Sequence, residues 1–339
     1  MNETIERIIG AYHYALTRKP HVDDVYEPGV LWTSMLELRR DFITALEDGN
    51  ADKLDSMLSN MFRNETTMFL LKYGKPTPDS KDEWEKKMSD NIIDDLYSWA
   101  RAVDNTNMDN LDSPIVGNPY GIWVGKGAMN PGSAFDATIS GDIVLTPASV
   151  PGNYYAQKIK HLLKLCGGNA VGEIGTGIGF LPYYLSRMTT GVRYVNFDLP
   201  EVLAVSQYFL MTALPDHTFM LGGEEVQDWD MALLPNFDIQ EWTMPVDVFV
   251  NIHSMSEMER DTIGVYVDNI ARLSNRYFYQ ENAIRDFELS NGMKEVGVNN
   301  FPGLNEKFIK IYNHPGIWRE PIYGEYLYEV RHEKLRNQS

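Results

Sequence analysis

Residues 171–180 read VGEIGTGIGF, and an aspartate, Asp198, closes the next apolar run along the chain. Residues 171–174 have the composition of the end of a buried strand, and residues 180–188 have the pattern of a helix that packs back on it. The glycines between them remove side chains and tolerate positive φ, so this loop can bring the backbone close to a ligand. The stretch therefore predicts a strand, a ligand-binding glycine loop and a helix in succession.

The spacing of the glycines discriminates between nucleotide cofactors. A dinucleotide-binding loop requires Gly-x-Gly-x-x-Gly. Here the third glycine, Gly179, comes one residue early, and Phe180 stands where it should be. The acid Glu173 precedes the first glycine by two residues, and its carboxylate suits the amino group and sulfonium of S-adenosylmethionine better than a pyrophosphate. The loop therefore favours S-adenosylmethionine over NAD, with a simple tight turn as the alternative.

The composition limits the classes of partner. The chain has 339 residues, 43% of them hydrophobic, which allows one large domain with an appendage or two domains. A formal net charge of -18 repels phosphate backbones, so we expect no nucleic-acid partner. The single cysteine, Cys166, excludes an intramolecular disulfide and a thiolate metal cluster. The sequence has no signal-peptide pattern and no apolar run of about 18 residues, so we expect a cytoplasmic protein that does not bind membranes.

Three parts are expected along the chain. Residues 1–110 predict a helical region, because apolar residues recur at intervals of three and four. Residues 111–153 are rich in glycine, proline, asparagine and serine, and their aromatic content predicts a loop-rich segment packed on the site. Residues 154–339 alternate short apolar runs with helical stretches, which predicts an α/β domain around a parallel sheet. The expected helices are 31–45, 54–62, 84–103, 154–165, 181–188, 201–214 and 261–273, and the expected strands are 170–174, 193–197, 217–221, 246–252, 276–280, 308–312 and 325–331.

The ends of the next two predicted strands carry further candidates for the cofactor site. Ligands of open parallel sheets bind beyond the carboxyl ends of the strands. At the second such end, Asp198 can accept both ribose hydroxyls, with Leu199 beside it in the site. Asp198 could instead cap the helix that begins near Pro200; the upstream glycine loop favours ribose binding. At the third end, Gly223 could approach the adenine, although a plain turn explains it equally well.

Candidate catalytic residues follow the fourth predicted strand. Asn251, His253, Ser254 and Glu257 all fall at its exit. Deprotonating a hydroxyl that attacks the methyl group of S-adenosylmethionine needs a base, and histidine suits that role near neutral pH. Glu257 could orient His253, act as the base itself or bind substrate hydroxyls. Alternatively, Ser254 and Glu257 form a helix-capping box and His253 has a structural or substrate-binding role.

These motifs resemble those of class I S-adenosylmethionine-dependent methyltransferases and, more narrowly, of the sugar O-methyltransferases. The resemblance rests on VGEIGTGIGFLPYYL (171–185), YVNFDLPEVLAVSQYFL (194–210) and VFVNIHSMSEM (248–258), supported by VGNPYG (116–121) and RYFYQEN (276–282). It covers about residues 115–330, with Thr176 in place of the family's usual glycine. It implies a Rossmann-like sheet that is mostly parallel with an antiparallel terminal strand.

The resemblance also implies roles for particular residues. The methionine part of the cofactor would be held by the loop, at Glu173, Gly175, Thr176, Gly177 and Gly179. The ribose would bind to Asp198, and residues 251–257, with Asn251 on the cofactor side and His253 and Glu257 as catalytic residues, would face cofactor and acceptor. Some sugar methyltransferases use a divalent metal, but Asn251 occupies a ligand position here, so we expect no metal.

The activity implied is in-line transfer of a methyl group to a hydroxyl of a sugar, a glycan or a glycosylated small molecule, with a general base removing the proton. Residues 1–110 and the glycine- and proline-rich segment are expected to form a lid or the surface of a homodimer. Two other classes stay open: a non-catalytic binding or assembly subunit with the methyltransferase fold, and an NAD-dependent oxidoreductase, which Glu173 and the glycine spacing disfavour.

Overall fold

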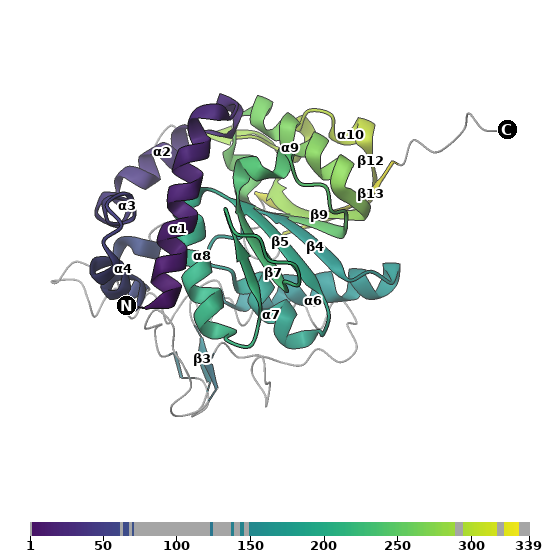
Figure 1. The fold of residues 1–339 in the computed structure, drawn as a ribbon. Helices are drawn as coiled ribbons and strands as arrows, with labels where there is room; N and C mark the ends of the chain where they lie inside the picture. Colours follow the sequence, from purple (N-terminus) through teal and green to yellow (C-terminus); the bar gives the residue numbers. More distant parts are fainter. Residues whose placement is uncertain are drawn as a thin grey trace.

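The computed structural model describes residues 2–61, 64–67, 70, 123–124, 137–138, 143–145, 149–288, 294–316 and 322–331. Its centre is an eight-stranded sheet with the strand order β12-β13-β9-β8-β4-β5-β7-β6 (Figure 1). Six neighbouring strands pair in parallel: β4 (Ala170–Ile174), β5 (Arg193–Asp198), β6 (Phe219–Leu221), β7 (Met231–Pro235), β8 (Val246–Ile252) and β9 (Ser274–Ala283).

A hairpin of the last two strands, β12 and β13, forms the end of the sheet next to β9. β13 (Tyr323–Val330) pairs antiparallel with β9, and β12 (Phe308–Pro315) pairs antiparallel with β13. The buried Glu325 of β13 accepts hydrogen bonds from Tyr154 (2.7 Å) and Tyr312 (2.9 Å) and pairs with Lys158 (3.2 Å). These contacts attach the hairpin to a helix on one face of the sheet. The predicted Rossmann-like sheet, mostly parallel with an antiparallel terminal strand, is therefore confirmed.

Helices cover both faces of this sheet. The α-helices are α1 (Glu3–Arg18), α2 (Val30–Glu37), α3 (Arg40–Glu47), α4 (Ala51–Leu58), α6 (Ser149–Cys166), α7 (Phe180–Met188), α8 (Pro200–Ala213), α9 (Arg260–Leu273) and α10 (Leu304–Lys307). The 3-10 helices are η1 (Lys19–His21), η2 (Asp24–Tyr26), η4 (Glu65–Thr67), η6 (Asn236–Gln240), η7 (Ser254–Glu257) and η8 (Val298–Asn300). The short strands β1 (Trp123–Val124), β2 (Ala137–Thr138) and β3 (Ile143–Leu145) form a separate antiparallel sheet, and β10 (Phe287–Glu288) pairs with β11 (Lys294–Glu295).

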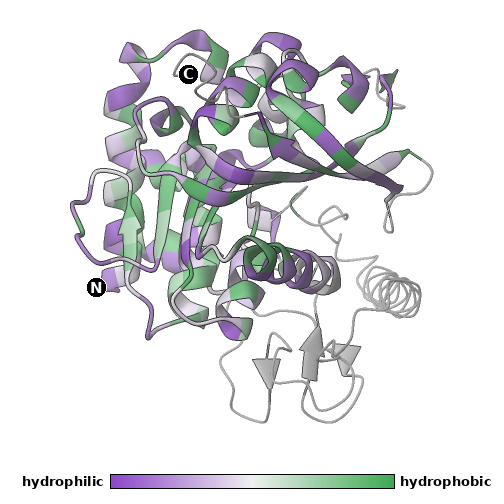
Figure 2. Ribbon diagram, turned by 90° about the vertical axis from the view of Figure 1, so that its right-hand side faces the viewer, coloured by the Kyte–Doolittle hydropathy of each residue, from purple (hydrophilic) through white to green (hydrophobic). Residues whose placement is uncertain are grey.

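The alternation of side chains along the strands divides the core into two layers. One face of the sheet packs against α6, α7 and α8, and the other against α9 and η6. Figure 2 shows the apolar residues concentrated on the strands, whereas the outer helices carry both hydrophilic and hydrophobic residues. The first face carries Val171, Tyr194, Leu233, Val248 and Tyr279, and the second carries Ile174, Val195, Phe197, Phe249 and Phe278.

The N-terminal helices add a further layer over α8. Residues Glu201 to Leu210 of α8 are all buried, because α1 packs on the side of α8 that faces away from the sheet. In Figure 1, α1 to α4 lie together beside α8. The N-terminal region therefore belongs to the body of the molecule. Among the described residues, no helix combines the length and the apolar character needed to cross a membrane.

Most of the predicted elements that lie within the described residues are present, with two differences. The helix expected over 31–45 is divided into α2 and α3, and the structure contains a strand, β7, for which no strand was predicted. The helix expected over 84–103 lies outside the described residues, as does most of the segment 111–153. The division of the chain into three parts stays a prediction.

Candidate functional site

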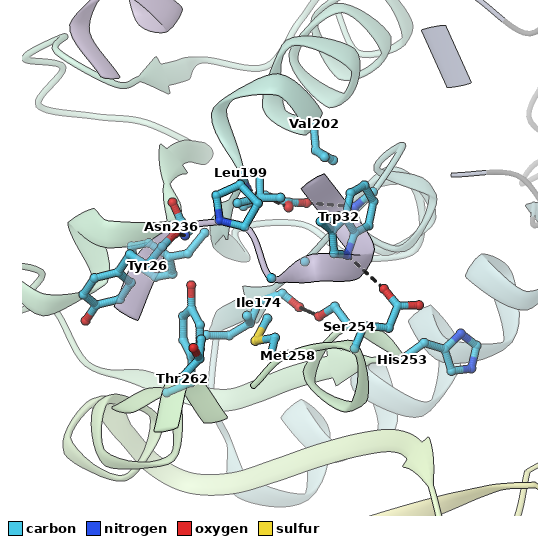
Figure 3. Close-up of a pocket in the computed structure, with 18 of the residues that line it drawn as sticks. Tyr26, Trp32, Ile174, Leu199, Val202, Asn236, His253, Ser254, Met258 and Thr262 are labelled. Atoms are coloured by element: carbon cyan, nitrogen blue, oxygen red, sulfur yellow. Dashed lines mark hydrogen bonds between the residues drawn. The ribbon is translucent and has the colours of Figure 1, made fainter. Parts of the chain in front are cut away.

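A cavity lies at the carboxyl ends of the parallel strands, where β4 has β5 on one side and β8 on the other. The strand order reverses at this point, which is where open α/β sheets bind their ligands. Figure 3 shows side chains from the strand ends, from α8 and α9 and from the N-terminal region around the cavity. The lining residues are Tyr26, Glu27, Pro28, Gly29, Trp32, Leu70, Ile174, Gly175, Gly177, Phe197, Asp198, Leu199, Val202, Asn236, Ile252, His253, Ser254, Glu257, Met258, Glu259, Thr262 and Tyr266.

Two glycines of the loop after β4 line this cavity. Gly175 has φ +76°, and a Cβ atom there would lie 2.3 Å from Ser254 Oγ. Gly177 has φ +59°, and the atom nearest to its Cβ would be Leu70 Cδ2 at 4.0 Å. Gly179, at the start of α7, does not line the cavity; its Cβ would approach the side chain of Leu210 at 3.0 Å. Gly175 therefore allows close packing, Gly177 leaves the cavity open, and Gly179 lets α7 approach α8.

Asp198 lies at the end of β5 and faces the glycine loop. Its carboxylate accepts hydrogen bonds from the backbone N–H groups of Gly177 (3.1 Å) and Leu199 (2.8 Å). Burial raises the pKa of Asp198 to about 7, against the opposing effects of these N–H groups and of the positive charge of Arg39. Leu199, and not Asp198, is the N-cap residue of α8, and no side chain caps this helix. The helix-cap alternative is therefore wrong, and Asp198 stays a candidate for ligand binding.

Glu173 is located behind the loop and does not line the cavity. Its side chain is only 2% exposed and accepts a hydrogen bond of 2.7 Å from the hydroxyl of Tyr194. Burial raises the pKa of Glu173 to about 7, and the hydroxyls of Thr176 and Tyr194 act in the opposite direction. The reason is strand alternation, which directs Glu173 to the face of Tyr194, whereas Ile174 lines the cavity. Neither Glu173 nor Thr176 is among the residues that line the cavity, and their contact with the cofactor stays a prediction.

Asn251 is likewise held in a network behind the cavity wall. Its side chain is fully buried, and its Nδ2 donates to the carbonyl of Ile174 (2.8 Å). Its Oδ1 accepts from Asn282 Nδ2 (2.8 Å) and from the N–H of Met255 (3.2 Å). Asn251 therefore joins β4, β9 and η7 and does not line the cavity, and its place on the cofactor side stays a prediction.

Gly223 follows the edge strand β6, and β7 separates that strand from β5 and the cavity. A Cβ there would lie 2.8 Å from the ring of Tyr14 in α1, and Gly223 is not among the lining residues. The prediction placed Gly223 after the third strand of the sheet, but β6 is the edge strand, and β7 lies between it and β5. The strand end next to Asp198 belongs to β7, and its exit residue Asn236 lines the cavity.

His253 lies at the rim of the cavity in a strained conformation. It is the one non-glycine residue with positive φ (68°, with ψ -31°) in the described part of the chain. Glu281 holds it twice: its carbonyl accepts from the His253 N–H (2.7 Å), and its carboxylate lies 3.1 Å from Nε2. The ring also packs edge-on against Tyr323, with centroids 5.0 Å apart. In Figure 3 the ring lies on the opposite side of the cavity from Tyr26 and Thr262.

Glu257 also lines the cavity, and its Oε2 accepts a hydrogen bond of 3.0 Å from Trp32 Nε1. Residues 254–257 form the 3-10 helix η7, which has no side-chain cap, so the capping-box alternative is wrong. The hydroxyl of Ser254 instead donates to the carbonyl of Ile174 (3.1 Å). His253 and Glu257 are thus brought to the same cavity as Gly175, Gly177, Asp198 and Leu199.

Sequence reasoning missed the lining residues that come from outside the motifs. Tyr26 and Trp32 come from the N-terminal region, and Thr262 and Tyr266 come from α9. Only Asn236 had a readable signal, because Met231 to Pro235 is an uninterrupted apolar run that ends at it.

The charged side chains that line the cavity are acidic. Glu27, Asp198, Glu257 and Glu259 contribute acidic side chains, and none of the described lining residues is a lysine or an arginine. Such a wall favours a ligand that carries positive charge. No group of three or more His, Cys, Asp or Glu among the described residues is arranged to hold a metal ion.

No protein-family model and no curated protein matches this chain. Among solved structures, it is similar to magnesium protoporphyrin IX methyltransferase from Synechocystis with bound SAH, at 12% identity and TM-score 0.41, covering 53% of this chain and 84% of that one. It is similar to the mitomycin 7-O-methyltransferase MmcR, at 15% identity and TM-score 0.41, covering 54% of each chain. It is also similar to the N-methyltransferase NodS from Bradyrhizobium japonicum, at 11% identity and TM-score 0.37, covering 53% and 87%. At this level of similarity, the chemistry of the site has to be inferred from its own residues.

Proposed function

We propose that this chain is an S-adenosylmethionine-dependent methyltransferase that acts on a hydroxyl group of a sugar or a glycosylated small molecule. The observation that carries the proposal is the meeting of Asp198 and the open Gly177 in one acidic cavity at the switch point of the sheet. A buried carboxylate at the end of the strand next to a glycine loop is suited to the two ribose hydroxyls of a nucleoside.

The remaining lining residues fit the other parts of this cofactor. Phe197, Leu199 and Val202 supply apolar surface beside Asp198 for an adenine ring. The acidic wall suits the positive charges of the sulfonium and the amino group, and it would repel the pyrophosphate of NAD. The NAD-dependent alternative is thereby disfavoured on charge as well as on the glycine spacing.

When bound, the cofactor supplies an electrophilic methyl group on sulfur. The protein aligns the acceptor oxygen with that methyl group and removes the proton from the hydroxyl as the oxygen attacks. His253 and Glu257, both at the rim near Ser254, are the candidates for receiving this proton. His253 is the better oriented by the chain itself, because Glu281 fixes both its backbone and its ring.

The sugar acceptor is supported by the sequence resemblance in residues 171–185, 194–210 and 248–258. The contribution of residues 1–110 to a lid is supported in part by Tyr26 and Trp32, which line the cavity. The homodimer, the absence of a metal and the cytoplasmic location stay predictions.

Calorimetric titration with S-adenosylmethionine, S-adenosylhomocysteine and NAD tests the cofactor. We expect the first two to bind and NAD not to bind. Asp198→Ala should weaken binding by about 1.5–3 kcal/mol, the scale of a charge-assisted hydrogen bond. Asp230→Ala is the matched control, because Asp230 also accepts a backbone N–H bond (2.8 Å, from Thr218) but does not line the cavity. Equal affinities of the two variants would remove Asp198 from the site.

Transfer of a tritiated methyl group to a panel of methyl glycosides tests the reaction. His253→Ala should lower turnover by roughly 10²-fold or more, with the affinity for S-adenosylhomocysteine unchanged. If turnover survives this substitution, Glu257 or solvent must take the proton. Cofactor binding without transfer to any acceptor would favour the non-catalytic binding subunit.

A further inference from the structure

The indole of Trp32 reaches the strand-exit loop from a distant part of the sequence. Its Nε1 donates to Glu257 Oε2 at 3.0 Å, and Figure 3 shows the labelled Trp32 among the side chains around the cavity. Both residues line the cavity. An N-terminal helix, α2, thus contacts an acid that the strand-exit motif places at the rim.

The segment that leads into α2 is fixed on the rest of the protein. The carbonyl of Tyr26 accepts from Asn236 Nδ2 (2.8 Å), and the carbonyl of Val25 accepts from Thr262 Oγ1 (3.0 Å). The ring of Tyr26 meets that of Tyr266 edge to face, with centroids 5.9 Å apart. Trp32 is therefore held by anchored backbone, which allows it to fix its partner.

The backbone around Glu257 is also fixed. The hydroxyl of Ser256 accepts from the N–H of Ala283 (3.0 Å), and the N–H of Ser256 donates to Asn282 Oδ1 (3.2 Å). These bonds fasten η7 to β9, so the direction of the Glu257 carboxylate depends on its side-chain contacts. The hydrogen bond from Trp32 Nε1 to Glu257 Oε2 is one of these contacts.

Glu257 lies at the boundary between the cavity and a second, open groove. Glu257, Met258 and Glu259 line the cavity and also an open groove on their other side, between α2 and the β10–β11 pair. If ribose binds to Asp198 at one end of the cavity, the end that adjoins the groove is left for the reacting methyl group and an incoming acceptor. A carboxylate at that junction would then lie near the sulfonium charge of the cofactor.

We propose that Trp32 is a positioning residue that holds the Glu257 carboxylate toward the sulfonium of the bound cofactor, at the end of the cavity open to the acceptor. The inference rests on the proposed function. It adds to that function a role for Trp32 and Glu257, whose hydrogen-bonded side chains would interact with the positive charge of the cofactor. S-adenosylmethionine carries the sulfonium charge and S-adenosylhomocysteine does not. The ratio of the two dissociation constants therefore measures the interaction without an acceptor.

The test is calorimetric titration of the full chain with each of these two compounds. Glu257→Gln should raise the ratio of the S-adenosylmethionine to the S-adenosylhomocysteine dissociation constant by about tenfold, and Trp32→Phe by about threefold. Trp32→Phe keeps an aromatic ring and removes only the N–H donor. The double variant should resemble Glu257→Gln alone, because Trp32 acts through Glu257. Trp229→Phe is the control for loss of an indole that does not line the cavity.

The outcomes separate the inference from the function on which it rests. An unchanged ratio in Glu257→Gln, additive effects in the double variant, or the same shift in Trp229→Phe would overturn the inference while leaving the cofactor assignment standing. Failure of the unmodified protein to bind either compound would overturn both. Circular dichroism checks folding, and Glu257→Gln keeps the test decisive if Trp32→Phe does not fold.

Discussion

Alanine substitutions at three glycines with positive φ separate backbone strain, packing and ligand contact in one experiment. Gly191→Ala measures strain alone, because φ is +70° and no atom lies within 4 Å of its Cβ. The expected loss of stability is about 1–2 kcal/mol. Gly177 has a similar φ and open space around it, so Gly177→Ala should cost the same.

Gly175→Ala should cost more, because its Cβ would lie 2.3 Å from Ser254 Oγ and 2.6 Å from Ser254 Cβ. Ser254 would have to move, and its hydroxyl would lose hydrogen bonds with the carbonyl of Ile174 and with Asn251 Nδ2. Two hydrogen bonds at about 0.5–1.5 kcal/mol each, added to the strain, give a total loss of about 2–5 kcal/mol.

The assays are urea unfolding and calorimetric titration with S-adenosylhomocysteine. Gly177→Ala should match Gly191→Ala in stability but bind the ligand more weakly, because its methyl group enters the cavity. If Gly175→Ala is as stable as Gly191→Ala, the close approach of the loop to Ser254 is refuted. If Gly177→Ala binds with unchanged affinity, the loop does not form the ligand wall.

Two other predictions concern the buried acids beside the loop. Burial raises the pKa of Asp198 from its ordinary value of 3.8 to about 7, and ribose hydroxyls need the ionised carboxylate as acceptor. Affinity for S-adenosylhomocysteine should therefore be constant above about pH 7 and fall by up to tenfold per pH unit below it, and Asp198→Asn should remove this dependence in calorimetry. Tyr194→Phe removes the hydroxyl that donates to Glu173, so unfolding should become easier by about 1–3 kcal/mol with ligand affinity unchanged; a large loss of affinity would return Glu173 to the ligand site.

The local parts of the fold could be predicted from the sequence. The strand 170–174 was predicted with its observed ends, and the glycine loop has the positive φ values at Gly175 and Gly177 that its composition suggested. The break between α2 and α3 could not be predicted, because it depends on a tertiary contact. Arg39 at this break is fully buried and donates through Nη2 to the carbonyl of Glu201 in α8, at 3.3 Å.

The candidate site was predicted only in part, for a similar reason. A polar residue at a strand exit can face a cavity, as Asp198 does, or face a partner inside the protein, as Glu173 and Asn251 do. The choice depends on Tyr194 and Asn282, which neighbouring strands bring close. Nothing in the local sequence shows these partners. The side chains from the N-terminal region were beyond prediction for the same reason.

The place of β13 in the sheet has a consequence for the order of folding. β13 lies between β9 and β12, although it follows both in the chain. During synthesis, β9 therefore has no neighbour on that side until residue 330 has emerged, and Tyr154 lacks its partner Glu325 for the same period. Non-local pairing of this kind is slow, and an unpaired edge strand favours aggregation. The nascent protein can therefore protect this edge of its sheet only after residue 330 has emerged, long after the glycine loop at residues 175–179 is complete.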